Sequence, residues 1–117
     1  MENRILVMSF DFSLDIIALY KILVQQHEFV LSKQLLRSAT SIGANVEEAN
    51  AAQTKKDFIA KMSIASKEAR ETRYWLRLLD KSQMVQYDYS PYLVSIEAMI
   101  KVLTKIVKTS QQSITPI

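Results

Sequence analysis

Apolar residues recur every three or four positions along most of the chain, which is the spacing of amphipathic helices. Three polar interruptions divide this pattern into four segments, at about residues 9–26, 29–53, 55–81 and 91–110. Four helices with short connections pack antiparallel, because each helix must return beside the one before it. The pattern therefore predicts an all-α protein: an up-down-up-down, left-handed four-helix bundle without strands.

The third segment carries the strictest periodicity. Its apolar and small residues alternate at spacings of four and three, the repeat that packs helices into left-handed bundles. We expect this stripe to face the core; its members are Phe58, Met62, Ala65, Ala69, Thr72, Leu76 and Leu79. Thr54 is a favourable N-cap for the helix, and Asp57 suits its positive end.

The other segments carry core-facing stripes of the same kind. They are Phe12, Ile16, Leu19 and Leu23 in the first, Leu35, Ala39, Ile42, Val46 and Ala49 in the second, and Tyr92, Ile96, Met99, Leu103 and Ile106 in the fourth. The first segment has a second apolar lane beside its stripe, formed by Ile17, Tyr20 and Val24. This helix is therefore apolar around most of its circumference.

Local signals refine the expected helices. Gly43 inside the second helix costs roughly 1 kcal/mol relative to Ala, and we expect the close approach of another backbone to compensate. Ser90 and Pro91 are expected to be the N-cap and the first residue of the fourth helix. Glu97 and Lys101 have the i,i+4 order that favours an ion pair. Residues 110–117 are expected to fray.

Composition limits the chemistry that the chain can perform. Its 117 residues fit one domain, with an ordered core at about 9–110. With no Cys and one Gly, it has no disulfide, thiolate site or Gly-rich phosphate loop. His27 lacks the Glu-x-x-His spacing of di-metal bundles, and we expect it to be a solvated loop residue. We expect no metal, cofactor, catalytic residue or small-molecule substrate.

Charge and targeting signals point to the cytoplasm. The chain has 15 Lys and Arg residues against 12 Asp and Glu residues, a mild net charge of +3. The uncharged run between Arg4 and Asp11 is too short for the apolar region of a signal peptide. No stretch approaches the roughly 18 apolar residues of a membrane helix. We therefore expect a cytoplasmic protein with no membrane partner.

Two runs of residues resemble the signature of a known family. The first is residues 34–49, QLLRSATSIGANVEEA, and the second is DFIAK at 57–61 followed by IASKEARETRYWLRLL at 64–79. They resemble a bacterial four-helix-bundle family named for proteins encoded by intervening sequences in 23S rRNA genes, sometimes labelled S23 ribosomal protein. The resemblance is looser over residues 9–23 and weak in the last helix.

The resemblance implies a bundle that assembles into a ring, with a pentamer as the expected state. It implies no enzymatic activity, since none is established for the family. Accessory proteins of diversity-generating retroelements look like distant relatives, and these bind a reverse transcriptase and nucleic acid. This chain has no stronger basic surplus that would place it in that subgroup. The expected partner is a copy of the same chain, with nucleic acid or a nucleic-acid enzyme as a further candidate.

A basic stripe on the third helix is the candidate nucleic-acid site. Residues 54–81 hold eight basic and four acidic side chains, a local charge of +4. The stripe lies away from the core positions and comprises Lys67, Arg70, Arg77 and Lys81, with Tyr74 interleaved and Arg73 at its edge. Such side chains bind phosphates and stack on bases. The alternative is an ordinary solvated face, partly neutralised by Glu71 beside Lys67.

Two further features carry competing interpretations. Ser41, Asn45 and Glu48 share one helical face, either as a small pocket with a general base or as a hydrogen-bonded cluster that fixes helix register. Trp75 lies off the main stripe, as a subunit contact or at the margin of a wide core-facing surface. Three functions follow: a ring-forming scaffold or adaptor that binds nucleic acid, a pure protein-interaction module, or, third, an enzyme around Asn45 and Glu48.

Overall fold

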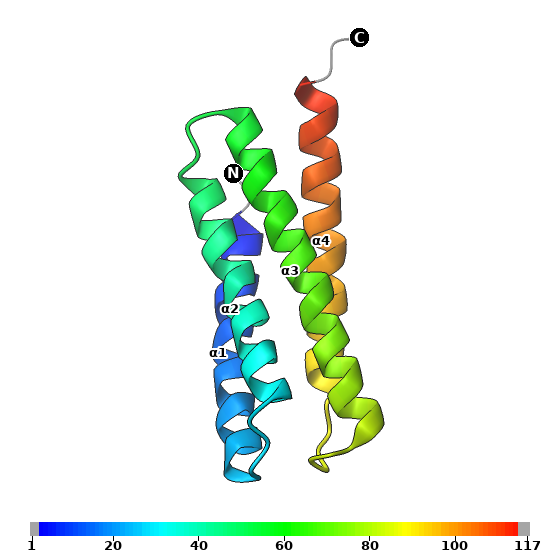
Figure 1. Cartoon of the computed structure of the whole chain (residues 1–117). Helices are drawn as coiled ribbons and strands as arrows, with labels where there is room; N and C mark the ends of the chain where they lie inside the picture. The colour runs from blue at the N-terminus through cyan, green and yellow to red at the C-terminus, as the bar shows by residue number, and fades with distance from the viewer. Residues whose placement is uncertain (1–2, 115–117) are drawn as a thin grey trace.

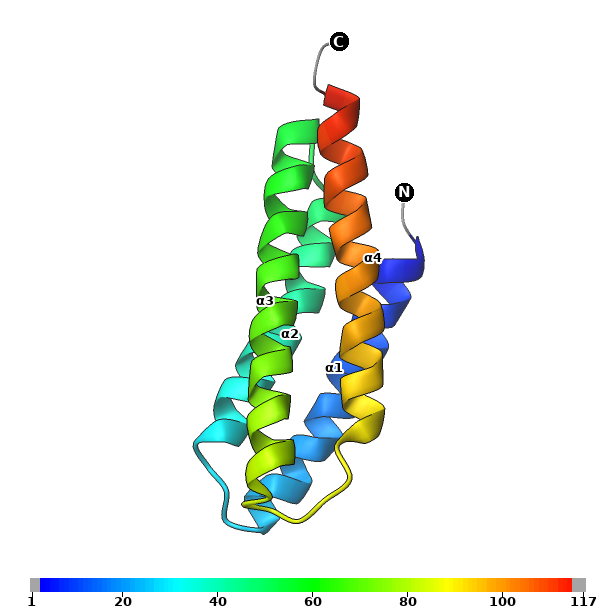
Figure 2. The same ribbon diagram turned by 90° about the vertical axis from the view of Figure 1, so that its right-hand side faces the viewer.

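The computed structural model describes residues 3–114, which form four helices and no strand. They are α1 (Asn3–Gln25), α2 (Leu31–Asn50), α3 (Lys55–Ser82) and α4 (Ser90–Ile114). Consecutive helices run antiparallel and side by side, and α4 returns beside α1 to close the bundle (Figures 1 and 2). α1 and α3 occupy diagonally opposite corners and are not neighbours in the bundle. The predicted antiparallel four-helix bundle is confirmed.

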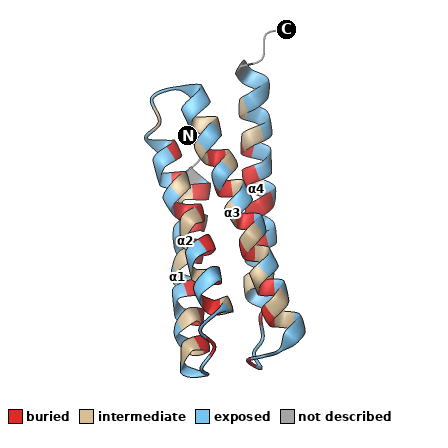
Figure 3. Cartoon of the chain, in the orientation of Figure 1, coloured by how far each residue is buried: buried red, intermediate tan, exposed pale blue. Residues whose placement is uncertain are grey.

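The predicted core-facing stripes meet along the axis of the bundle, as the inward positions in Figure 3 show. Their members are all buried except Phe58 and Tyr92, which are partly buried. The helix period therefore identified which face of each helix points inward. The core also takes in residues outside these stripes, namely Ile5, Val85, Tyr89 and Ile100.

Small residues let α1 and α2 approach closely. A Cβ atom at Gly43 would lie 3.4 Å from the Ser13 hydroxyl and 3.5 Å from the Ser9 carbonyl oxygen. The Ser13 hydroxyl itself donates a 3.0 Å hydrogen bond to that carbonyl. The expected close approach of a second backbone at Gly43 is therefore confirmed, and the neighbouring helix is α1.

One polar pair lies inside the core between α2 and α3. The Thr72 hydroxyl donates to the Ser38 hydroxyl at 2.8 Å, and both residues are fully buried. Ser38 in turn donates to the Leu35 carbonyl, so neither hydroxyl lacks a partner. A satisfied buried pair of this kind fixes the relative register of two helices.

The helix ends differ from the sequence prediction. α1 begins at Asn3, not residue 9, because Ile5 and Ser9 continue its buried face by two turns. α4 continues to Ile114, so the expected fraying is wrong for residues 110–114; residues 115–117 lie outside the described part. The described helices therefore extend beyond residues 9–110 at both ends. α2 is shorter than predicted, from Leu31 to Asn50.

Glu28 explains where α2 begins. Its buried carboxylate accepts hydrogen bonds from the N–H groups of Val30 at 3.0 Å, Leu31 at 3.0 Å and Ser32 at 2.6 Å. These are among the donors that a helix leaves unsatisfied at its N-terminus, where negative charge is also favoured. His27, exposed and at φ 65°, turns the chain out of α1, as expected of a loop residue.

The start of α4 corrects another expectation. Ser90 is already helical and is not the N-cap; its N–H donates to Asp88 Oδ1 at 3.0 Å. Hydrogen bonds from the Ser90 side chain and backbone lower the pKa of the Asp88 carboxyl. Tyr89 anchors this turn, because its buried hydroxyl donates to the Val85 carbonyl at 2.8 Å. Pro91 lies in the first turn, where its missing N–H costs nothing.

Truncation of the α3 stripe should destabilise the bundle. Leu76 is fully buried, so Leu76→Ala is expected to lower the free energy of unfolding by roughly 2–5 kcal/mol through lost burial and a residual cavity. Urea unfolding followed by circular dichroism measures this loss. Leu78 lies two residues further along α3 and is only partly buried, so Leu78→Ala should cost less. Equal costs for the two variants would contradict the assigned core face.

Removal of the α2 cap should also be measurable. Glu28→Ala leaves three backbone N–H groups without their carboxylate and is expected to cost about 1–2 kcal/mol of unfolding free energy. Glu28→Gln retains one acceptor oxygen and should lose less. Thermal and urea unfolding of the two variants give the comparison. Equal free energies of unfolding for Glu28→Ala and the wild type would contradict this contribution, because solvent would then satisfy the three N–H groups as well as the carboxylate does.

Candidate functional site

The basic stripe lies on the outward face of α3. Of its members, Lys67, Arg70, Tyr74, Arg77 and Lys81 are exposed, and Arg73 is partly buried at the edge that faces α4. The stripe follows the helix because these residues occupy the positions opposite the buried 4-3 pattern. The structure therefore brings all six predicted residues onto one side of the bundle.

Two arginines of the basic stripe are engaged by α4. Arg73 donates to Glu97 at 2.6 Å, and this hydrogen bond holds the pKa of Glu97 below its usual range. Arg70 donates to the Thr104 hydroxyl at 3.1 Å. The predicted Glu97–Lys101 ion pair is not formed, because Glu97 reaches across to α3 instead. Arg73 and Arg70 are thus less available to an external phosphate than the sequence suggested.

The remaining cations of the basic stripe are free. Lys67, Arg77 and Lys81 form no ion pair with any residue between 3 and 114. Glu71, which the alternative interpretation placed beside Lys67, turns toward α2 instead and pairs with Arg37. α4 adds exposed positive charge on its own outward face with Lys101, Lys105 and Lys108.

Trp75 lies at the margin of the core and links to α2. Its indole N–H donates to Glu71 at 2.9 Å, and Glu71 pairs with Arg37, which also contacts Glu68 at 3.4 Å. The ring is partly buried against the core and meets Tyr74 edge-on, with centroids 5.2 Å apart. This geometry favours a wide core-facing surface over a subunit contact for Trp75.

The polar cluster of Ser41, Asn45 and Glu48 forms local hydrogen bonds. Ser41 donates to the Arg37 carbonyl, and Asn45 donates to the Ser41 carbonyl, each at 2.8 Å. Glu48 pairs with Lys61 of α3 at 2.9 Å; the hydrogen bond and attraction of Glu48 raise the pKa of Lys61. Neither the cavity at the end of the bundle nor the hollow between α1 and α4 is lined by the cluster. These contacts favour the interpretation as a cluster that fixes helix register over that of a pocket with a general base.

An exposed apolar stripe on α1 was missed by the sequence analysis. Its four residues follow spacings of three, four and three on the face opposite the core: Val7 (60% exposed), Phe10 (59%), Leu14 (52%) and Ile17 (36%). We call this set the α1 apolar stripe. Of the predicted second lane, Ile17 belongs to it, whereas Tyr20 and Val24 are partly buried. Sequence spacing gives the period of a helix but does not show which of two apolar stripes faces the core. The sequence therefore did not reveal that this stripe is exposed.

Other classes of site find no support within the part of the chain that the structure describes. Residues 3–114 contain no group of three His, Cys, Asp or Glu side chains placed to hold a metal ion. None of the described helices is long and apolar enough to cross a membrane. Two surfaces are therefore the candidates for contact with another macromolecule, the basic stripe and the α1 apolar stripe.

The fold and these surfaces define a small helical-bundle protein whose outward faces carry the features available for interaction. The chain belongs to the 23S rRNA-intervening sequence protein family, whose model matches residues 1–105. The resemblance carried by the two runs in α2 and α3 is thereby confirmed.

A solved structure supports the same assignment. The chain is similar to a protein with unknown function from the S23 ribosomal protein family of Bacteroides thetaiotaomicron VPI-5482. The two share 46% sequence identity with a TM-score of 0.85, and the match covers 89% of this chain and 98% of the other. No curated protein matches the chain. The two comparisons agree on the family, and neither assigns an activity.

Proposed function

We propose that this protein is a non-enzymatic scaffold that assembles with copies of itself into a closed, five-membered ring in the cytoplasm. The α1 apolar stripe carries the proposal. Each of its residues is at least one-third exposed in the isolated chain, and their spacing is the one that a neighbouring helix packs against. Full burial of such side chains contributes roughly 1.5–3 kcal/mol each, so a contact along the stripe offers a substantial driving force.

A ring requires two different surfaces on each subunit, because its contacts run head to tail. The α1 apolar stripe supplies one surface at one corner of the bundle. At the diagonal corner, α3 exposes Ile64 (41%), which is apolar and lies outside the basic stripe. Two apolar surfaces at opposite corners allow each copy to contact two neighbours.

We propose that the ring binds nucleic acid through the basic stripe of each subunit. Lys67, Arg77 and Lys81 are exposed and free of ion pairs within residues 3–114, so no internal contact must break before they meet phosphates. Tyr74 offers an exposed ring between them. Repetition of the basic stripe around a ring would strengthen a weak single contact through multivalency.

A second candidate, the protein-interaction module, rests on a different observation. Asp11 and Asp15 are exposed beside the α1 apolar stripe, and no salt bridge engages either one in the described part of the chain. Their charge is complementary to that of the basic stripe on a neighbouring copy. If these groups pair across the subunit contact, the basic stripe is consumed by assembly and has no role in binding nucleic acid.

Charge placed in the α1 apolar stripe should break the assembly. Leu14 is exposed in the single chain, so Leu14→Glu should leave the helices folded while burying a charge at the subunit contact. Sedimentation velocity is expected to show a shift to monomer. Val94→Glu is the matched control, because Val94 is 70% exposed but lies on α4, outside the stripe. Equal sedimentation of Leu14→Glu and the wild-type assembly would refute this contact.

Charge reversal in the basic stripe should weaken nucleic-acid binding. The double variant Arg77→Glu with Lys81→Glu is expected to lower affinity for a short single-stranded RNA and to reduce the slope of log K against log salt by roughly 1.4, about 0.7 per phosphate contact. Fluorescence anisotropy at several salt concentrations measures both. The control carries Lys21→Glu with Lys33→Glu, which changes net charge equally elsewhere. Loss of assembly in the Arg77 and Lys81 variant, with no RNA binding by the wild type, would favour the interaction module.

Stacking on Tyr74 predicts a preference for single strands. Tyr74→Ala should cost roughly 1–3 kcal/mol in binding a single strand and little in binding a duplex, whose bases are already stacked. Tyr74→Phe retains a stacking face and should bind almost as the wild type does. Parallel titrations with a single strand and its duplex provide the measurement. An equal loss for both nucleic acids would mean that Tyr74 acts only through the shape of the surface.

A further inference from the structure

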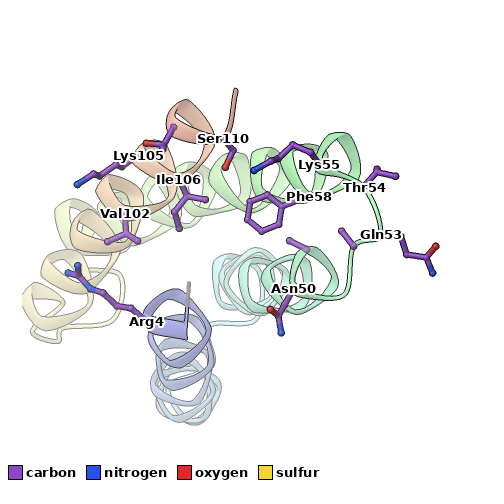
Figure 4. A pocket seen from close by; sticks show the side chains of 13 residues that line it. Arg4, Asn50, Gln53, Thr54, Lys55, Phe58, Val102, Lys105, Ile106 and Ser110 are labelled. Carbon is purple, nitrogen blue, oxygen red and sulfur yellow. The ribbon is translucent and has the colours of Figure 1, made fainter. Parts of the chain in front are cut away.

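One end of the bundle is hollowed by a cavity of about 780 Å³. It lies where the first turns of α1 and α3 meet the last turns of α2 and the C-terminal half of α4, so all four helices contribute to its wall. Figure 4 shows this bundle-end cavity from close by. Its volume falls within the range of about 300–1,000 Å³ that is typical of pockets for small organic ligands.

The wall of the bundle-end cavity combines an apolar surface with positive charge. Phe58, Val102 and Ile106 supply the apolar surface between α3 and α4 (Figure 4). Three cations from three helices stand around it: Arg4, Lys55 and Lys105. The lining contains no Asp or Glu, although such residues make up a tenth of the chain.

These three cations are unpaired in the described part of the chain. None of them forms a salt bridge with any residue between 3 and 114. Lys55 stands in the first turn of α3, so its charge adds to those of Arg4 and Lys105 at this end of the bundle. Thr109 and Ser110 of α4 add neutral hydroxyl donors to the same lining. The electrostatic field at the cavity therefore favours an anion.

We infer that the bundle-end cavity binds a small organic anion. The apolar body of the ligand lies against Phe58, Val102 and Ile106, and the carboxylate or phosphate of the ligand is held among Arg4, Lys55 and Lys105. The positive charge disfavours a metal cation, and the apolar surface gives no advantage to a bare inorganic anion. The ligand is an addition to the sequence-based picture, which included no small molecule, and it implies no reaction.

This site is independent of the proposed scaffold surfaces. No residue that lines the cavity belongs to the α1 apolar stripe or to the basic stripe. Variants of the cavity therefore need not change assembly or RNA binding. Failure of one proposal leaves the other intact, and the same set of variants distinguishes the two.

Fluorescence titration of the full chain with 1-anilinonaphthalene-8-sulfonate tests the inference, because this probe has an aromatic body and one anionic group. We expect saturable binding at one site per chain that weakens with salt. Lys55→Glu should weaken binding by about tenfold or more, since it replaces attraction with repulsion. Lys33→Glu, at the other end of the bundle, is the matched control and should bind as the wild type does.

A second variant tests the cavity without altering charge. Thr109 is exposed and lines the wall, so Thr109→Trp should fill the space while the helix remains folded, which circular dichroism verifies. Binding of the probe should be lost. Probe binding that survives both Lys55→Glu and Thr109→Trp, or that disappears only in Leu14→Glu, would place the dye on the α1 apolar stripe and overturn the inference.

Competition experiments distinguish two classes of organic anion, an aliphatic carboxylate and an aromatic phosphate. Displacement of the probe by decanoate would identify an aliphatic carboxylate as the ligand class, and displacement by phenyl phosphate would identify an aromatic phosphate. Either result supports the bundle-end cavity as an organic-anion site. Failure of both compounds to displace the probe, at concentrations where salt alone has no effect, would contradict it.

Discussion

The 4-3 stripe of α3 is the constraint on which the bundle depends. α3 is the longest helix and packs against both α2 and α4, so its fully buried positions must serve two neighbours at once. Small residues at Ala65 and Ala69 and the larger Met62, Leu76 and Leu79 fill this shared space. Because interiors are close-packed, the positions of α2 and α4 follow from this one stripe.

The same geometry decides which surfaces remain for interaction. Once α3 is fixed in the core, its opposite face carries the basic stripe, and its edges are tied to neighbours through Arg73–Glu97 and Glu48–Lys61. α1, at the diagonal corner, buries one apolar stripe and leaves a second one uncovered. A four-helix bundle has no further helix to cover that second stripe. In the proposed ring, a neighbouring copy of the chain covers the α1 apolar stripe.

The sequence predicted the parts of the structure that depend on helix period. The core stripes and the role of Gly43 follow from spacing and residue size alone, and the structure confirms them. Helix ends were less accessible, because the capping of α2 by Glu28 requires a carboxylate to fold back over its own loop. The partner of Glu97 was also out of reach, since sequence spacing shows neighbours along one helix and not across two.

The candidate sites also depend partly on helix period and partly on the packing between helices. Periodicity placed the basic stripe on one face, yet only the packing of α4 decides which of its arginines are engaged. The bundle-end cavity is lined by residues from all four helices, so its position could not be predicted from the sequence pattern of any one helix.

The native mass of the wild-type chain at micromolar concentration tests the central claim most directly. Native mass spectrometry should show one closed species of about 67 kDa, five times the 13.4 kDa of the chain. A dimer would retain the contact along α1 but contradict the ring. A stable 13.4 kDa monomer with the α1 apolar stripe open to solvent would contradict the scaffold as a whole.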